Sequence, residues 1–408
     1  MHLAQLRLRD FRNYPRLDVN FAPGFHVLLG DNAQGKTNIL EAIYLMATLR
    51  SFRGVGSAQM IRHGQKGYFV GGKVVGGIIP ARKAVSSLSS PKGGEGWGEA
   101  VIDIQNPSPQ PSPRLGGARE TKILTSQLER EIKMFWSSRE RKLTLDGHPV
   151  KKLGDYLGTL RTVCFCTEDL QLVKGTGRTR RRFLDLLLSQ TQPGYLALLQ
   201  RYMQVVRSRN ALLKQFSPDA MLLDSYSEQL VKLGGEIIRH RRELIPKLSP
   251  LARLAYRRIS NDAEELRIAY EPSVKNDFAV ELAQVRDRER RFRATLLGPH
   301  RDDLQLLLNE KSAAQFGSEG QKRTLAIALK MAQAEYLTGI HGSAPVLLID
   351  DVMGELDVKR RSGLLPLLER ARETSGQVFM TCTEENWPRE LGRELQRWEV
   401  KAGALEKL

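Results

Sequence analysis

The stretch that most limits the fold is a glycine-rich turn, GDNAQGKT, at residues 30 to 37. It satisfies the pattern G-x-x-x-x-G-K-[ST] at every fixed position. The apolar run FHVLL at 25 to 29 is typical of a buried strand, and a helical pattern of apolar residues begins at about Lys36. A strand, this turn and a helix in succession predict a P-loop within an α/β fold that contains parallel strands.

The chemistry of such a turn is the binding of phosphate. Its glycines let backbone amides point inward and form an anion nest at the start of a helix. We expect Lys36 to neutralise the β- and γ-phosphates of ATP and the Thr37 hydroxyl to bind Mg²⁺. The expected nucleotide contacts are Gly30, Asp31, Asn32, Ala33, Gln34, Gly35, Lys36, Thr37 and Asn38. The alternative, a chance glycine turn before a helix, does not account for both flanking elements.

A second motif, APVLLIDDVMGELD at 344 to 357, is an apolar strand that ends in two carboxylates. We expect Asp350 to bind Mg²⁺ and Asp351 to polarise the attacking water. An aliphatic run that ends in acids is common by itself. In a chain that also has a P-loop it is a stronger indication of a nucleotide site, because parallel strands of one sheet end side by side at the nucleotide.

A third motif, SEGQKR at 318 to 323, precedes a long helical pattern. Ser318 suits the cap of that helix, and a serine cap is the simplest explanation of the motif. With Gly320 and Gln321 it also resembles the signature loop of ABC-type ATPases, whose serine meets the γ-phosphate held by the opposing subunit. The chain departs from that pattern at Gly317 and Glu319, which argues against a transporter.

Patterns along the rest of the chain suggest three segments. Residues 1–175 would form the N-terminal part of an ATPase head, 176–262 a helical arm, and 263–408 the C-terminal part of the head. Residues 84–120 are rich in Ser, Pro and Gly, so we expect a disordered insertion, with a binding tail as the alternative. The arm reads as two or three amphipathic helices, broken at Pro193 and at Gly234-Gly235.

Charge and composition narrow the class of partner. The chain has 408 residues, with 63 Lys and Arg against 46 Asp and Glu, for a formal charge of +17. Such an excess favours a polyanionic partner, either nucleic acid or an anionic membrane surface. We expect no membrane span, because no run of 18 apolar residues occurs. Cys164 and Cys166 read as strand residues, so we expect a reduced, cytoplasmic protein.

In the order of its motifs the chain resembles the RecF family, the bacterial recombination and gap-repair ATPases. The resemblance covers nearly everything except the insertion. It rests on these stretches: LRLRDFRNY (6–14), GDNAQGKTNILEAI, TEDLQLVKG (167–175), RRRFLD (180–185), LLGPHRDDL (296–304), SEGQKRTLAIALK and LLIDDVMGELD. The resemblance implies an α/β fold with an ABC-type ATPase head, called lobe I, and a smaller helical lobe II.

The resemblance also implies a function. Two heads would form an ATP-dependent homodimer that binds gapped or single-strand/double-strand DNA, with slow, Mg²⁺-dependent ATP hydrolysis. The dimer would act with RecR and RecO and help RecA onto DNA in repair, replication restart and the SOS response. Ser318 would act in trans, Asp357 would lie near the dimer interface, and Arg12 and Asn13 would approach the nucleotide.

Several assignments stay open at this stage. Glu168 or Asp169 could take the Q-loop place, where Gln171 is the nearest glutamine. Thr381 and Thr383 could sense the γ-phosphate or be ordinary strand-end residues, and His300 is more simply structural. Two basic clusters could bind DNA phosphates or be solvated helix faces: Arg178, Arg180, Arg181 and Arg182, and Arg239, Arg241 and Arg242. A solvated face is the preferred interpretation of the second cluster. A transporter motor subunit, an SMC-like clamp and a small-molecule P-loop kinase remain as rival functions.

Overall fold

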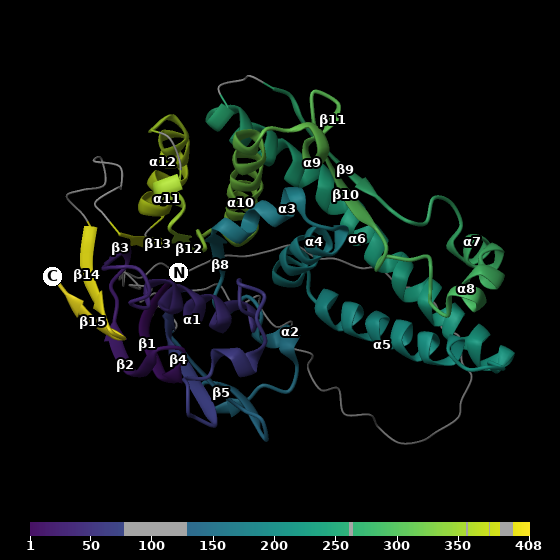
Figure 1. The fold of residues 1–408 in the computed structure, drawn as a ribbon, viewed down its shortest axis with the longest axis horizontal. Helices are drawn as coiled ribbons and strands as arrows, with labels where there is room; N and C mark the ends of the chain where they lie inside the picture. Colours follow the sequence, from purple (N-terminus) through teal and green to yellow (C-terminus); the bar gives the residue numbers. More distant parts are fainter. Residues whose placement is uncertain (77–128, 261–263, 356–357, 375, 384–394) are drawn as a thin grey trace, which may run out of the picture. The chain divides into compact units, whose positions relative to one another are not determined.

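The computed structural model describes residues 1–76, 129–260, 264–355, 358–374, 376–383 and 395–408 (Figure 1). The predicted insertion at 84–120 and the predicted interface residue Asp357 lie outside these described residues. All described residues fall within one contact unit. The division of the chain at 175 and 262 stays a prediction.

The central sheet has the strand order β15-β14-β3-β13-β12-β8. All its neighbouring strands are parallel except the terminal β14-β15 pair (Figure 1). The strands are β3 (Gly24–Leu29), β8 (Thr162–Phe165), β12 (Val346–Asp350), β13 (Gln377–Cys382), β14 (Leu395–Lys401) and β15 (Ala404–Lys407). Since only β13 separates β3 from β12, the glycine-rich turn and the acidic strand end meet at one edge of the sheet.

Each face of this sheet is buried in its own core, as is usual for parallel strands. Leu348 lies on the face that packs against α1 (Lys36–Thr48), which in turn contacts the antiparallel sheet. Leu347 lies on the opposite face, in the cluster that includes α10 (Glu319–His341) and α12 (Val358–Glu373). The helix that follows the glycine-rich turn is therefore enclosed between two sheets.

The second sheet is antiparallel, with the order β2-β1-β4-β5-β6-β7. One of its faces contributes Leu3, Leu6 and Leu8 to the core around α1. The strands are β1 (His2–Phe11), β2 (Tyr14–Asn20), β4 (Gly67–Val75), β5 (Glu129–Ser137), β6 (Arg141–Leu145) and β7 (His148–Pro149). The sequence patterns at residues 3–9, 68–75, 132–137 and 141–147 are typical of strands, and they coincide with β1, β4, β5 and β6; β2 and β7 were not predicted.

Three helices follow: α4 (Gly177–Thr191), α5 (Tyr195–Leu213) and α6 (Ala220–Ser260). The predicted break at Gly234-Gly235 is wrong, because α6 continues through both glycines for 41 residues. Gly234 is required by packing instead, since a Cβ there would come within 2.7 Å of the Phe278 ring. A glycine that looks like a helix breaker in sequence here allows a close contact between elements.

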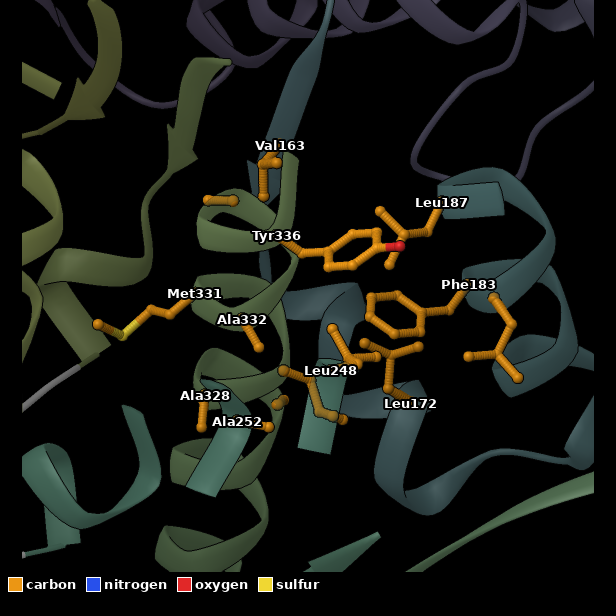
Figure 2. Close-up of a cluster of buried hydrophobic side chains, with 14 of the residues drawn as sticks. Val163, Leu172, Phe183, Leu187, Leu248, Ala252, Ala328, Met331, Ala332 and Tyr336 are labelled. Carbon is orange, nitrogen blue, oxygen red and sulfur yellow. The ribbon is translucent and has the colours of Figure 1, made fainter. Parts of the chain in front are cut away.

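The remaining elements complete the fold, and several of them contact α6 or α10. The third sheet has the order β11-β10-β9, and β9 contacts α6. Figure 2 shows the shared core, in which Tyr336, Ala332 and Ala328 of α10 lie near Phe183, Leu172 and Leu248. These elements are α2 (Leu153–Tyr156), α3 (Gln171–Lys174), β9 (Leu266–Glu271), α7 (Phe278–Gln284), α8 (Arg286–Phe292), β10 (Asp303–Leu308), β11 (Lys311–Ser312), α9 (Ala313–Phe316), α11 (Val352–Glu355), and the 3₁₀ turns η1 (Ser57–Met60) and η2 (Thr167–Leu170).

Among the described residues, the search for helices with the length and apolar character needed to span a bilayer finds none.

Candidate functional site: a P-loop and an acidic strand end

The glycine-rich turn joins β3 to α1, and its backbone needs glycine at two positions. Gly30 has a φ of 144°, and a Cβ there would overlap the carbonyl oxygen of Val400. Gly35 has a φ of 116°, and a Cβ there would lie 2.5 Å from the Asn13 side chain. The first turn of α1 has no side-chain cap. Its amides are therefore available to an anion, as in other helix N-termini that bind phosphate.

Lys36 lies on the inner side of this turn. Its Nζ donates to the main-chain carbonyls of Gly30 and Asp31, the latter at 2.9 Å. Burial lowers the pKa of the ammonium, and the nearby Asp351 and Asp31 carboxylates oppose that shift. Because these carbonyls are neutral acceptors, a phosphate in the turn would offer Lys36 a stronger, charge-assisted hydrogen bond.

Thr37 and Asp350 meet at the centre of the site. The Thr37 hydroxyl donates to Asp350 Oδ1 at 2.7 Å, although 313 residues separate them in the chain. Thr381 of β13 donates to the same oxygen at 2.9 Å. Burial raises the pKa of Asp350, while the hydrogen bonds from Thr37 and Thr381 lower it. Thr381, left open by the sequence, thus belongs to the site, whereas Thr383 is exposed.

The same group of side chains suits a magnesium ion. The Thr37 hydroxyl and the Asp350 carboxylate are hard oxygen donors, the type that Mg²⁺ prefers. No cluster of three or more His, Cys, Asp or Glu side chains able to hold a metal occurs in the described ranges. A magnesium ion at Thr37 and Asp350 would therefore complete its shell with phosphate oxygens and water, as is common for Mg²⁺.

Asp351 follows directly and is held by its backbone. It has a φ of 55°, and its N–H donates to Thr381 Oγ1 at 2.9 Å. Its side chain is exposed, yet close enough to Cys382 to help burial raise the pKa of that thiol to about 11. Because of this left-handed backbone, the chain changes direction at Asp351, directly after β12 ends at Asp350. The two carboxylates therefore have different surroundings, one buried and one open to solvent.

Asn13 and Arg12 support this site from the turn between β1 and β2. Asn13 Nδ2 donates to the carbonyl of Gln34 at 2.7 Å, and its Oδ1 accepts from Asn38 at 2.8 Å. Arg12 makes two 2.8 Å bonds to the fully buried carboxylate of Glu41 on α1. Both residues thus hold the turn and its helix in place. Their predicted approach to the nucleotide stays a prediction.

Two further contributors were missed in the sequence. Arg53, in the loop after α1, donates to Asn38 Oδ1 at 3.2 Å, and its charge lowers the pKa of Asp350. The β14-β15 turn also reaches the P-loop, since the N–H of Ala402 donates to Gln34 Oε1 at 2.7 Å. Neither SFRG at 51 to 54 nor KAGA at 401 to 404 matches a phosphate-binding pattern, so only the tertiary structure reveals them.

Glu168 and Asp169, both considered for the Q-loop, have separate roles. Asp169 is largely buried, accepts from the N–H of Cys166 at 2.9 Å and forms an ion pair with Lys330 at 3.4 Å. Glu168 is exposed, and its charge helps raise the pKa of Asp350. Asp169 therefore stabilises the junction with α10, and Glu168 is the acid that faces the site.

Ser318 caps α10 as the sequence suggested. Its Oγ accepts from the N–H of Gln321 at 3.2 Å, and Gln321 Oε1 accepts from the N–H of Ser318 at 2.6 Å. Gln321 Nε2 also donates to Glu264 at 2.7 Å. The hydroxyl is exposed, with Gly320 beside it. In the described part of the chain, the hydrogen bonds of the Ser318 and Gln321 side chains lead to their own helix and Glu264, not to the P-loop.

The first basic cluster is partly engaged within the chain. Arg180 makes bonds of 2.7 and 2.8 Å to the Asp303 carboxylate, and Arg181 donates to the carbonyl of Asp302. Arg178 and Arg182 are exposed. A structural role explains Arg180 and Arg181 fully, and DNA contact by the cluster stays a prediction.

The second basic cluster was misjudged at one position. Arg241 is 1 % exposed and binds Asp185 and Asp302, so its assignment to a solvated face is wrong. Arg239 is exposed and pairs with Glu243, as a solvated face requires. His300 is structural, because Tyr202 donates to its Nδ1 at 2.6 Å and burial lowers its pKa to about 4.

A largely parallel sheet with a P-loop and an acidic strand end at one edge, and a capped serine motif ahead of the acidic strand, define an ABC-type ATPase head. Solved Smc heads share this fold; for the Pyrococcus furiosus head the TM-score is 0.52 at 13% identity, over 100% of this chain and 96% of that one. Within this class the chain belongs to the RecF family of DNA replication and repair proteins.

The relatives and solved structures agree on this family. The chain is 36% identical to the DNA replication and repair protein RecF of Lactobacillus johnsonii, over 99% of both chains. It is 35% identical to that of Symbiobacterium thermophilum, over 99% of this chain and 98% of the relative. A structure of the recombination mediator protein RecF with ATP, in the RecFOR pathway, has a TM-score of 0.79 and 27% identity over 100% and 99% of the two chains. No family model matches the chain.

Proposed function

We propose that this chain is an ATP-dependent DNA-binding switch that binds ATP and Mg²⁺ at the P-loop. The observation that carries the proposal is the 2.7 Å bond from Thr37 to Asp350, which joins the two motifs at one point. Lys36 and the first amides of α1 would hold the β- and γ-phosphates. Mg²⁺, held by Thr37 and Asp350, would neutralise charge on the phosphate oxygens.

The proposal assigns the hydrolytic role to Asp351. Its carboxylate is exposed and separate from Asp350, so it is free to accept a hydrogen bond from the attacking water. Its backbone is fixed by Thr381, which also binds Asp350, so the two acids keep a defined relation. We propose slow turnover, as suits a switch, in which loss of the γ-phosphate ends the ATP-bound state.

The proposed active form is a homodimer. Ser318 is exposed at the N-terminus of α10 and has only local partners, which supports a role toward the γ-phosphate of a second copy. Each composite site would then use the P-loop of one chain and Ser318 of the other. Gly320, Gln321 and Asp357 are proposed to line the same interface.

The DNA-binding part of the proposal follows the family. A related structure is named as a recombination mediator in the RecFOR pathway, and the formal charge of this chain is +17. We propose gapped or single-strand/double-strand DNA as ligand, RecR and RecO as partners, and RecA loading as the outcome. Arg178 and Arg182 are exposed and remain candidates for phosphate contact.

Light scattering after gel filtration, with and without ATP and Mg²⁺, tests the proposal. The wild-type chain is expected to dimerise with ATP, whereas Lys36→Arg and Ser318→Arg are expected to stay monomeric. Binding of labelled ATP distinguishes the variants, because Ser318→Arg should retain ATP and Lys36→Arg should not. A wild-type chain that stays monomeric with saturating ATP would refute the switch.

A further inference from the structure

The outer face of the antiparallel sheet contains a pocket of about 470 Å³. None of its lining residues belongs to the candidate nucleotide site. Its lining residues belong to β1, β2, β4 and β5, and its charged residues lie on the face away from the core around α1. Its lining includes the cations Arg7, Arg9, Arg16 and Lys133, the carboxylates Asp10 and Asp18, which pair with Arg62 and Arg7, and the aromatic rings Phe69 and Phe135. Nothing in the chemistry of ATP binding accounts for this combination.

The register of the strands puts these side chains in one row. Arg9 of β1 is directly opposite Arg16 of β2 on one side and Phe69 of β4 on the other. Phe69 is in turn directly opposite Phe135 of β5, and Phe135 is opposite Lys142 of β6. Neighbouring strands lie about 4.8 Å apart, so successive side chains of this row are close together. The two aromatic rings lie between Arg9 on one side and Lys142 on the other.

The pair of arginines is unfavourable for the fold alone. Like charges directly opposite on neighbouring strands destabilise a sheet. Both side chains are exposed, and no ion pair to a carboxylate is found for either of them within the described residues. By contrast, Arg7 and Lys133 have carboxylates nearby, Asp18 and Glu131. An anionic ligand would explain why Arg9 and Arg16 face each other unpaired.

The aromatic rings are fixed by glycines on β4. A Cβ at Gly71 would lie 2.7 Å from the Phe69 ring, and one at Gly67 would lie 3.4 Å from the Phe135 ring. Each ring thus leans over a residue without a side chain, which limits its motion and hollows the sheet surface. Phe135 is 37 % exposed on a face where polar side chains are usual. Phe69, directly opposite Phe135, is partly exposed on the same face.

We propose that this pocket binds a single-stranded nucleic acid segment, with bases stacked on Phe135 and Phe69 and phosphates at Arg9 and Arg16. One exposed and one partly exposed ring beside unpaired cations suit single-strand binding, because every base has a face that stacks and every nucleotide carries a phosphate. A paired duplex would offer the cations its phosphates but keep its bases stacked inside. This inference rests on the DNA binding proposed above, and it places that binding at a site separate from the P-loop.

The test uses fluorescence anisotropy of the full-length chain without nucleotide, with a labelled dT oligonucleotide and an abasic oligonucleotide of equal length. Arg9→Ala/Arg16→Ala is expected to weaken both probes about tenfold, and to reduce the salt slope by about 1.4, at about 0.7 per phosphate contact. Phe135→Ala is expected to weaken dT about tenfold with the salt slope unchanged, and to leave the abasic probe unaffected. Thermal unfolding should show no loss of stability in the double arginine variant, because it relieves repulsion.

The matched control is Lys151→Ala/Lys152→Ala, which removes the same charge from two exposed lysines outside the pocket. Equal effects of the two double variants would overturn the proposal in favour of general attraction. Unchanged dT affinity in Phe135→Ala would overturn it as well, and a change in sedimentation of that variant would then identify a second copy of the chain as the occupant. Dimerisation with ATP, measured on the same variants, should be intact and reports on the proposed switch independently.

Discussion

The P-loop turn and the Ser318 turn are both helix N-termini, yet the chain equips them very differently. At α1 the turn is surrounded by Asn13, Asp350 and the β14-β15 turn, so it is held by contacts from three other parts of the sequence. At α10 the capping box of Ser318 and Gln321 is nearly self-contained and exposed. We propose that the first turn holds phosphate within one chain, and that the exposed second turn acts on the γ-phosphate bound by another copy of the chain. The difference supports the two-chain site that the resemblance to the RecF family implies and that we propose for this chain.

Among the changes considered, Asp350→Asn in the P-loop site is expected to have the largest effect on ATP hydrolysis. The amide keeps the size of the side chain and an acceptor for Thr37, but it removes the charge that would hold Mg²⁺. Steady-state ATP hydrolysis is expected to fall on the order of a thousandfold, equivalent to about 4 kcal/mol of transition-state stabilisation. Turnover within tenfold of wild type, in a protein with normal thermal stability, would show that Asp350 is not the metal ligand.

A mixture of two inactive variants sharpens the comparison further. Lys36→Ala keeps the Ser318 turn, and Ser318→Arg keeps the P-loop, so a heterodimer of the two regains one complete composite site of two. ATP hydrolysis of the mixture is expected to exceed that of either variant alone by about tenfold. The reason is that the complete site again has Ser318 of one chain opposite the γ-phosphate held by Lys36 of the other. Activity that is merely the average of the two variants would mean that both turns act within one chain.

The pH dependence of the free energy of unfolding distinguishes the contribution of Asp350 from those of His26 and His300. Burial lowers the pKa of His26 and of His300 to about 4, below the ordinary 6.5. Between these values the unfolded chain binds more protons, so the free energy of unfolding should fall as pH falls from 6.5 toward 4, by up to about 1.4 kcal/mol per pH unit for each histidine. Asp350 acts with the opposite sign: its raised pKa means that its contribution is present at low pH and lost as pH rises through the folded-state pKa.

Urea unfolding at pH 8, 6 and 5 measures this dependence. His300→Gln should flatten the acid slope, because its amide can accept from Tyr202 without titrating. Asp350→Asn serves as the control that leaves the histidine slope in place. An equal slope in wild type and His300→Gln would show that His300 does not govern the acid response.

The smallest expected effects come from two adjacent glycines in α6. Gly234→Ala would place a Cβ against the rings of Phe278 and Tyr202, and should destabilise the chain by about 1–3 kcal/mol. Gly235→Ala has open space and should stabilise it by about 0.5–1 kcal/mol, since alanine favours a helix interior. Denaturant unfolding of both variants decides the matter. Opposite signs confirm that packing retains Gly234, while equal signs would contradict it.

The structural elements that the sequence predicted correctly are those fixed by short-range pattern. The strand, turn and helix around Lys36, and the strand that ends at Asp350, have local signals that survive in isolation. The capping of α10 by Ser318 is of the same kind. The misses depend on contacts that no local window contains. Gly234 looks like a helix breaker until Phe278 lies beside it, and Arg241 looks solvated until Asp185 and Asp302 surround it.

The Ala402 contact with Gln34 and the pairing of β3 have a consequence for the synthesis of the chain. β3 carries the P-loop, but its two neighbours are β13, where Gln377 pairs with Gly24, and β14, where Leu395 pairs with Phe25. A ribosome working at about 5–20 residues per second leaves β3 without either neighbour for tens of seconds. During that interval β3 is an apolar strand without a partner strand. Such segments are prone to aggregate, and chaperones protect them. The loop that would hold ATP is thus among the first parts to be made and among the last to be completed.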